Sequence, residues 1–285
     1  MNPCLTRRAA LLAAAFALAA AALPSRAAGA TYQFSPVNQY GIQVTAAYWN
    51  PIIDYVSEKS GVQLRLKIGR TSADTTAYVL AQEVDFVFTN HLFSPEREAL
   101  GWKVFGRRMT PPLHGQIVVP ADSPIGELAQ LAGKEVAFPG PEATIAYKFT
   151  YAQLLARKIE VMPVFAGNMD GAFVQLFAGK AAAVGANSQL VEGYTQREGK
   201  KFKVLWSSPP LHDLALMHSA RVPAADAQAV ARAFLGMHLD PRGRDILEAA
   251  SKLAGITSGG HFAASNGSEY GAYRDFYRTA PPQLR

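Results

Sequence analysis

Short apolar runs alternate along the chain with segments of helical period. Residues 62–68 alternate strictly between apolar and polar side chains, which predicts a half-buried strand. Residues 84–88 are apolar except for Asp85 and predict a more deeply buried strand. Between them, Ser72 is expected to be the N-cap of a helix over residues 73–82. Further strands are predicted at residues 117–119, 135–138, 161–165, 181–185, 202–206 and 214–218. Further helices are predicted at residues 94–101, 141–158, 170–178, 188–197, 223–238 and 241–253. This alternation predicts an α/β protein with mainly parallel sheets in two lobes, between which the chain crosses more than once.

The first thirty residues have the pattern of a targeting segment. Arg7 and Arg8 precede an apolar stretch of fifteen residues, 9–23, and the small-x-small sequences at 25–27 and 28–30 fit cleavage sites. A membrane anchor is the alternative, but it needs about 20 apolar residues. We therefore expect residues 1–30 to be a cleaved signal peptide and the mature protein to be periplasmic, with the Sec and twin-arginine export routes both open. The only cysteine, Cys4, would be removed with that segment.

Composition excludes several classes of protein. Of the chain's residues, 49% are hydrophobic and 18% are charged, a composition that is incompatible with general disorder. The length of 285 residues is enough for two lobes, each with a hydrophobic core. The formal net charge of +6 includes Arg7, Arg8 and Arg26; the remaining chain has 25 basic and 22 acidic side chains and no basic run longer than Lys200-Lys201. Nucleic-acid binding is therefore not expected.

No catalytic or metal-binding pattern is found in the sequence. Phosphate-loop, dinucleotide-binding and nucleophile-elbow motifs are absent, and the six histidines show no H-x-H or H-E-x-x-H spacing. We expect no catalytic residue, no metal site and no cofactor. The protein is therefore expected not to be an enzyme.

Residues 138–147 form the most informative local feature. A strand is predicted to end at Phe138, a Pro/Gly turn follows, and a helix is expected to begin near Pro141 or Glu142. Such a helix start presents free N–H groups at the carboxyl edge of the sheet, where open α/β sheets bind ligands. A plain connecting turn is the alternative interpretation.

Four segments carry a resemblance to a known family. They are residues 50–56 with Gly61, residues 84–88, residues 118–125 leading to Leu131-Ala132-Gly133-Lys134, and residues 240–247. Together they resemble periplasmic substrate-binding proteins of ABC transporters, specifically the phosphonate/phosphite/phosphate-binding family with the type II fold. The resemblance implies two lobes, each a mainly parallel sheet flanked by helices, with the ligand cleft between them. Lobe 1 is expected to comprise residues 31–115 and 214–285, and lobe 2 residues 116–213.

The binding residues of that family are poorly matched. Where the family has a Ser-Thr-Ser-Gly run at a helix start of the second lobe, residues 143–146 of this chain keep only Thr144. Two family tyrosines correspond to Ser72 and Thr89, a family histidine has no counterpart near residues 168–170, and an acidic residue is retained as Asp213. Glu142 is expected beside the same amides, so phosphonate and phosphite are expected to bind weakly. The candidate ligand-binding residues are Gln39, Tyr40, Ser72, Thr89, Asn90, His91, Thr144, Tyr147, Asn168, Asp170 and Asp213.

The resemblance implies a solute receptor of an ABC-type uptake system. Its two lobes would close on a small solute, with an anionic, phosphonate-like molecule as one candidate, and deliver it to the permease in the inner membrane. A monomer is expected. The alternatives are a periplasmic ligand-sensing module for a membrane signalling receptor and a secreted enzyme.

Overall fold

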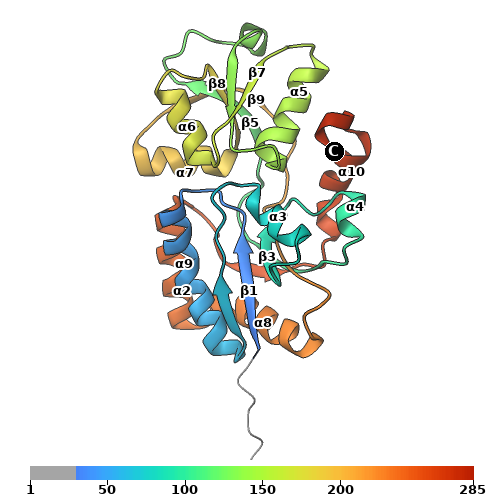
Figure 1. The fold of residues 1–285 in the computed structure, drawn as a ribbon. Coiled ribbons are helices and arrows are strands. Elements are labelled where there is room, and N and C mark those ends of the chain that lie inside the picture. Colours follow the sequence, from blue (N-terminus) through green and yellow to red (C-terminus); the bar gives the residue numbers. More distant parts are fainter. Residues whose placement is uncertain (1–29) are drawn as a thin grey trace, which may run out of the picture. The chain divides into compact units, whose positions relative to one another are not determined.

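The computed structural model describes residues 30–285, of which Thr31–Arg285 form one compact unit. The predicted signal peptide lies outside the described residues, apart from Ala30. The described chain builds two sheets with helices on their faces (Figure 1). No helix within residues 30–285 is long and apolar enough to cross a membrane.

The six-stranded sheet combines the first and last parts of the unit. Its order is β11-β4-β10-β3-β1-β2. The strands are β1 (Thr31–Pro36), β2 (Gln63–Leu66), β3 (Phe86–Thr89), β4 (Lys103–Arg108), β10 (Ala215–His218) and β11 (Phe262–Ala264). Its helices are α2 (Ile42–Ser60), α3 (Asp74–Leu80), α4 (Pro95–Glu98), α8 (Ala224–Gly236), α9 (Pro241–Ala254) and α10 (Gly271–Thr279).

The five-stranded sheet is formed by the middle of the chain. Its order is β7-β6-β8-β5-β9. The strands are β5 (Gly115–Pro120), β6 (Glu135–Phe138), β7 (Met162–Phe165), β8 (Ala183–Asn187) and β9 (Phe202–Ser207). Its helices are a π-helix (Thr144–Phe149) that continues into α5 (Thr150–Ala156), α6 (Met169–Phe177) and α7 (Ser188–Glu198).

Both sheets are mixed, with mainly parallel strand directions as predicted. Most strands of each sheet point the same way, but β5, β10 and β11 run against their neighbours. β5 and β10 are the first strands after the two crossings between the sheets, and each lies between two strands of opposite direction. Between the crossings, Leu113 and Leu211 form an isolated antiparallel bridge with N–O distances of 2.8 and 2.7 Å.

Helices cover both faces of the six-stranded sheet. Phe86 and Phe88 pack into the core that contains Trp49 of α2 and Phe234 of α8, whereas Val87 joins the separate cluster that contains Tyr273 of α10. This alternation explains why residues 86–88 are apolar on both faces of a buried strand.

The helix after β2 begins one residue later than expected. Its N-cap is Ala73, without a side-chain hydrogen bond, so the prediction that Ser72 caps it is wrong. Asp74 organises this turn instead, because its carboxylate accepts hydrogen bonds from the amides of Arg70 at 2.5 Å and Thr71 at 2.9 Å. The side chain of Ser72 therefore makes no capping hydrogen bond to α3.

Candidate functional site

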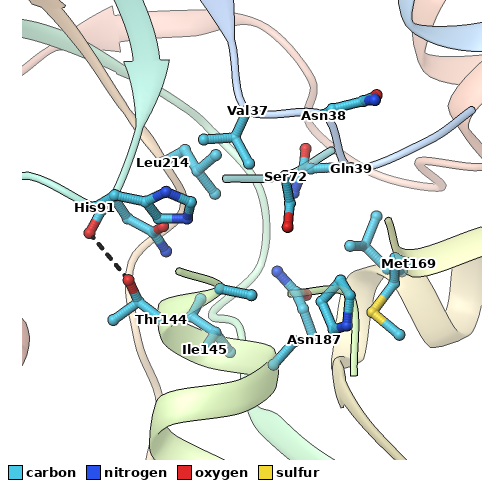
Figure 2. A pocket seen from close by; sticks show the side chains of 15 residues that line it. Val37, Asn38, Gln39, Ser72, His91, Thr144, Ile145, Met169, Asn187 and Leu214 are labelled. Atoms are coloured by element: carbon cyan, nitrogen blue, oxygen red, sulfur yellow. Dashed lines mark hydrogen bonds between the residues drawn. The ribbon is translucent and has the colours of Figure 1, made fainter. Parts of the chain in front are cut away.

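A cavity of about 40 Å³ lies between the two sheets. From the six-stranded side it is lined by Val37, Asn38, Gln39, Ser72, Asn90, His91 and Leu214. From the five-stranded side it is lined by Pro139, Ala143, Thr144, Ile145, Ala146, Met169, Asn187 and Leu190 (Figure 2).

The ends of four strands position this lining. The chain reaches the cavity directly after β1, β3 and β6, and at the last residue of β8. These are carboxyl ends, the edge at which open α/β sheets bind ligands. Asn38 fixes the first of these loops, because its amide donates to the carbonyl of Gly69 at 3.1 Å and its oxygen accepts from Thr45 Oγ1 at 2.8 Å.

Ser72 joins the two sides of the cavity. Its backbone N–H donates to the carbonyl of Gly167 at 2.7 Å, which ties the loop before α3 to the loop after β7. Its side-chain oxygen is buried and has no hydrogen-bond partner among the described residues, and it points into the cavity (Figure 2). A Cβ at Gly140 would come within 2.5 Å of that oxygen, so glycine leaves the hydroxyl its space.

His91 contributes a neutral imidazole. It is 1% exposed, and its Nδ1 lies 2.9 Å from Thr76 Oγ1. Burial lowers the pKa of His91 from 6.5 to about 3, an effect larger than those of the neighbouring Glu142, Arg97 and Lys148 charges. The ring is therefore uncharged at neutral pH.

The helix that reaches the cavity from the five-stranded side begins at Thr144, later than the expected start near Pro141 or Glu142. The carbonyl of Ala143 accepts from both Tyr147 N at 2.9 Å and Lys148 N at 3.0 Å, which widens the first turn into a π-helix. The amides of Thr144, Ile145 and Ala146 have no hydrogen-bond partner within the described part of the chain, as expected for the first residues of a helix. These three residues are buried and line the cavity.

Glu142 does not sit on these amides, so that expectation is wrong. Its carboxylate accepts from Arg97 Nη1 at 2.5 Å, and the same guanidinium atom donates to the carbonyl of His91 at 2.8 Å. Burial acts to raise the pKa of Glu142, but the hydrogen bond and charge of Arg97 outweigh it and lower that pKa. The ion pair links α4 to the loop before the π-helix.

Further hydrogen bonds hold the two sides of the cavity together. Thr144 Oγ1 donates to the carbonyl of Asn90 at 3.3 Å (Figure 2). Met169 N donates to the carbonyl of Gln39 at 3.2 Å. With the contacts of Ser72 and Arg97, these bonds show that the two sides meet directly in this structure.

The cavity brings together five of the eleven predicted ligand-binding residues: Gln39, Ser72, Asn90, His91 and Thr144. The other six do not line it. Thr89 Oγ1 accepts from His91 N, Tyr147 packs among aromatic rings beside Phe138, and Asn168 caps α6 through Gly171 N at 2.9 Å.

Tyr40, Asp170 and Asp213 lie in charged clusters behind the cavity. Asp170 pairs with Arg197 at 2.5 Å, and that guanidinium also lies 5.2 Å from the ring centre of Tyr40. Asp213 is 2% exposed and accepts from Arg108 Nε at 2.7 Å, while Arg108 Nη2 donates to Gln189 Oε1 of α7 at 2.9 Å.

Among the lining residues that were not predicted, Asn187 and Asn38 are polar. Asn187 had a signal in the sequence, because it ends a buried apolar strand and its side chain caps α7 through Gln189 N at 2.9 Å. The remaining additions are apolar or small, such as Met169 and Leu190, and nothing distinguishes them from core residues in the sequence. Within residues 30–285, no group of three or more His, Cys, Asp or Glu side chains could hold a metal ion.

The sequence matches a protein family described as "ABC transporter, phosphonate, periplasmic substrate-binding protein" over residues 34–260. The chain belongs to this phosphonate-binding family. The family consists of transport proteins that bind a substrate rather than enzymes, and its members are periplasmic partners of membrane permeases. A search of curated proteins finds no significant match.

Solved structures show that this member of the phosphonate-binding family has the two-lobed type II fold. A binding protein of an ABC phosphonate transporter from Pseudomonas aeruginosa is similar with a TM-score of 0.74 and 14% identity, over 88% of this chain and 87% of that one. PhnD1 from Prochlorococcus marinus, in complex with methylphosphonate, has a TM-score of 0.74 and 12% identity, over 87% and 97%. A Xanthomonas citri protein bound to ATP has a TM-score of 0.65 and 15% identity, over 88% and 98%. At these identities the likeness shows the fold alone.

Proposed function

We propose that this chain captures a small polar solute between its lobes and delivers it to the permease of an ABC transporter. The observation that carries the proposal is the cavity itself, which is lined from the carboxyl edges of both sheets and contains unpaired hydrogen-bond donors. Lobe 1 would comprise residues 31–115 and 214–285, and lobe 2 residues 116–213, hinged at the paired crossings near Leu113 and Leu211. Export by a cleaved signal peptide over residues 1–30 and a monomeric state belong to the same proposal.

The five predicted residues that line the cavity are proposed to contact the solute. Opening would break the hydrogen bonds that Ser72, Thr144 and Met169 make across it. The solute would favour the closed form because it contacts both lobes at once only there. The family match favours this transport role over the sensing alternative.

A thermal-shift screen of the purified mature protein against anions, amines and metabolites tests the proposal. A solute that binds only the folded state raises Tm, by an amount equivalent to about 2.7 kcal/mol at one hundred times Kd. Gly140→Ala should reduce the shift, because the new Cβ would come within 2.5 Å of Ser72 Oγ and turn that hydroxyl away from the solute. Gly236→Ala is the matched control, since its Cβ meets nothing within 4 Å. The proposal is wrong if no solute shifts the wild type, and a full shift in Gly140→Ala would show that Ser72 does not contact the solute.

A further inference from the structure

The cavity has no charged side chain among its lining residues. Its polar side chains are the amides Asn38, Gln39, Asn90 and Asn187, the hydroxyls Ser72 and Thr144, and the neutral imidazole of His91. The remaining lining is apolar and includes Ile145 and Met169. A ligand here therefore meets dipoles rather than a counter-charge.

The charged side chains around the cavity interact with partners outside its lining. Arg97 pairs with Glu142, Arg108 with Asp213, and Arg197 with Asp170. The ammonium of Lys148 lies 4.9 Å from the ring centre of Tyr277 and donates to the main-chain oxygen of Arg285 at 3.5 Å. None of these seven side chains lines the cavity.

The unpaired groups are mainly donors. Ser72 is 2% exposed, and its hydroxyl faces the cavity without a partner among residues 30–285. The buried amides of Thr144, Ile145 and Ala146 are likewise unpaired within that range. A buried donor without an acceptor is costly, so this set is complementary to a compact group of oxygen acceptors.

These two observations limit the charge of the ligand. Hydrogen bonds to an ionised acceptor are shorter and stronger than those to a neutral one, so an anion gains more from these donors than a neutral isostere does. The Born cost of desolvation rises with the square of the charge, and no lining cation offsets the second charge of a dianion. We propose that the site selects compact oxo-monoanions over both the corresponding dianions and neutral isosteres. This inference rests on the proposed solute-binding function.

Three ligands of similar size separate the alternatives by isothermal titration. Methanesulfonate is a monoanion throughout the working range, dimethyl sulfone is neutral, and methylphosphonate changes from monoanion to dianion near neutrality. Titrations at about pH 5.5 and about pH 8.5 should show methanesulfonate binding equally, because His91 stays neutral at both values. Methylphosphonate should bind about tenfold more weakly at the higher pH, in proportion to its monoanion fraction. Dimethyl sulfone should not bind detectably.

Ser72→Ala tests whether the named donor contacts the anion. It should weaken methanesulfonate binding by a factor of ten or more, the range for a hydrogen bond to a charged group. Thr71→Ala is the matched control, because the neighbouring hydroxyl bonds to Asp74 and does not line the cavity; it should change the affinity less than about threefold.

Methylphosphonate that binds more tightly at the higher pH, or dimethyl sulfone that binds more tightly than methanesulfonate, would overturn the inference. The inference would also be overturned if none of the three ligands bound while another solute raised the protein's Tm. That result would leave the proposed function intact. Absence of any solute that shifts Tm would overturn both.

Discussion

The buried ion pair between Arg108 and Asp213 should be the most sensitive polar contact of the hinge region. Both side chains are 1% exposed, and the N–O distance is 2.7 Å. Asp213 also accepts from Thr110 Oγ1 at 3.2 Å and from its neighbour's amide, that of Leu214, at 2.7 Å. The charge and hydrogen bonding of Asp213 outweigh the effect of burial and raise the pKa of Arg108 well above its usual value, so the guanidinium stays charged.

Asp213→Ala should therefore lower the free energy of unfolding by about 3–5 kcal/mol, because it leaves the guanidinium of Arg108 buried without a counter-charge. Urea denaturation followed by circular dichroism measures this loss. Arg242→Ala is the matched control, since Arg242 and Glu58 form an ion pair with side chains 57% and 55% exposed. It should cost less than about 1 kcal/mol.

The double variant Arg108→Met/Asp213→Leu tests whether the loss comes from the unpaired charge of Arg108 or from the substitution at residue 213 itself. It should recover most of the loss, because apolar residues can replace a buried ion pair at little cost. A loss below about 1 kcal/mol for Asp213→Ala would refute the reasoning, since it would show that Arg108 reaches water in the folded protein.

Three further outcomes are expected. Burial holds His91 neutral with a pKa of about 3, so between pH 6.5 and that value only the unfolded state takes up a proton on this side chain. The free energy of unfolding should therefore decrease by about 1.4 kcal/mol for each unit by which the pH falls through this window. Urea denaturation of His91→Gln across the same pH range should lack this slope. Glu142 has a lowered pKa, so its contribution is present above its ordinary value of 4.5 and is lost as the pH falls through the lower folded value; Glu142→Gln should flatten the acid limb of Tm against pH, whereas an unchanged limb would show that the Arg97 pair adds nothing. N-terminal sequencing of the exported protein should begin at about residue 28 or 31, and a full-length, membrane-retained chain would contradict the predicted signal peptide.

The sequence predicted those elements whose pattern is local. Strand β6 matches the predicted range 135–138, and α4 (Pro95–Glu98) lies within the predicted helix 94–101. Strands β1, β4 and β11 were missed because they are fixed by pairing with distant segments, and Gly106 interrupts the apolar pattern of β4. The mixed pairing of the sheets has the same origin, since strand direction depends on where the chain crosses between them.

The position of the candidate site in the fold could be predicted from the sequence, but the identity of most of its side chains could not. Strand ends and helix starts were the right positions, and Ser72 and Thr144 reach the cavity from them. Asn168 occupies a similar position, yet its side chain caps its own helix, and Asp170 pairs with Arg197. A polar residue at a helix start can bond to its own backbone or face a ligand, and only the fold decides between the two.

A crystal structure of the complex with a solute that raises Tm would locate the binding site directly. We expect electron density for the solute between the lobes, with its acceptor atoms within hydrogen-bond distance, roughly 2.7–3.2 Å, of Ser72 Oγ and of the amides of Thr144 and Ile145. Density for the solute outside this cavity, with Ser72 and Thr144 uncontacted, would contradict it.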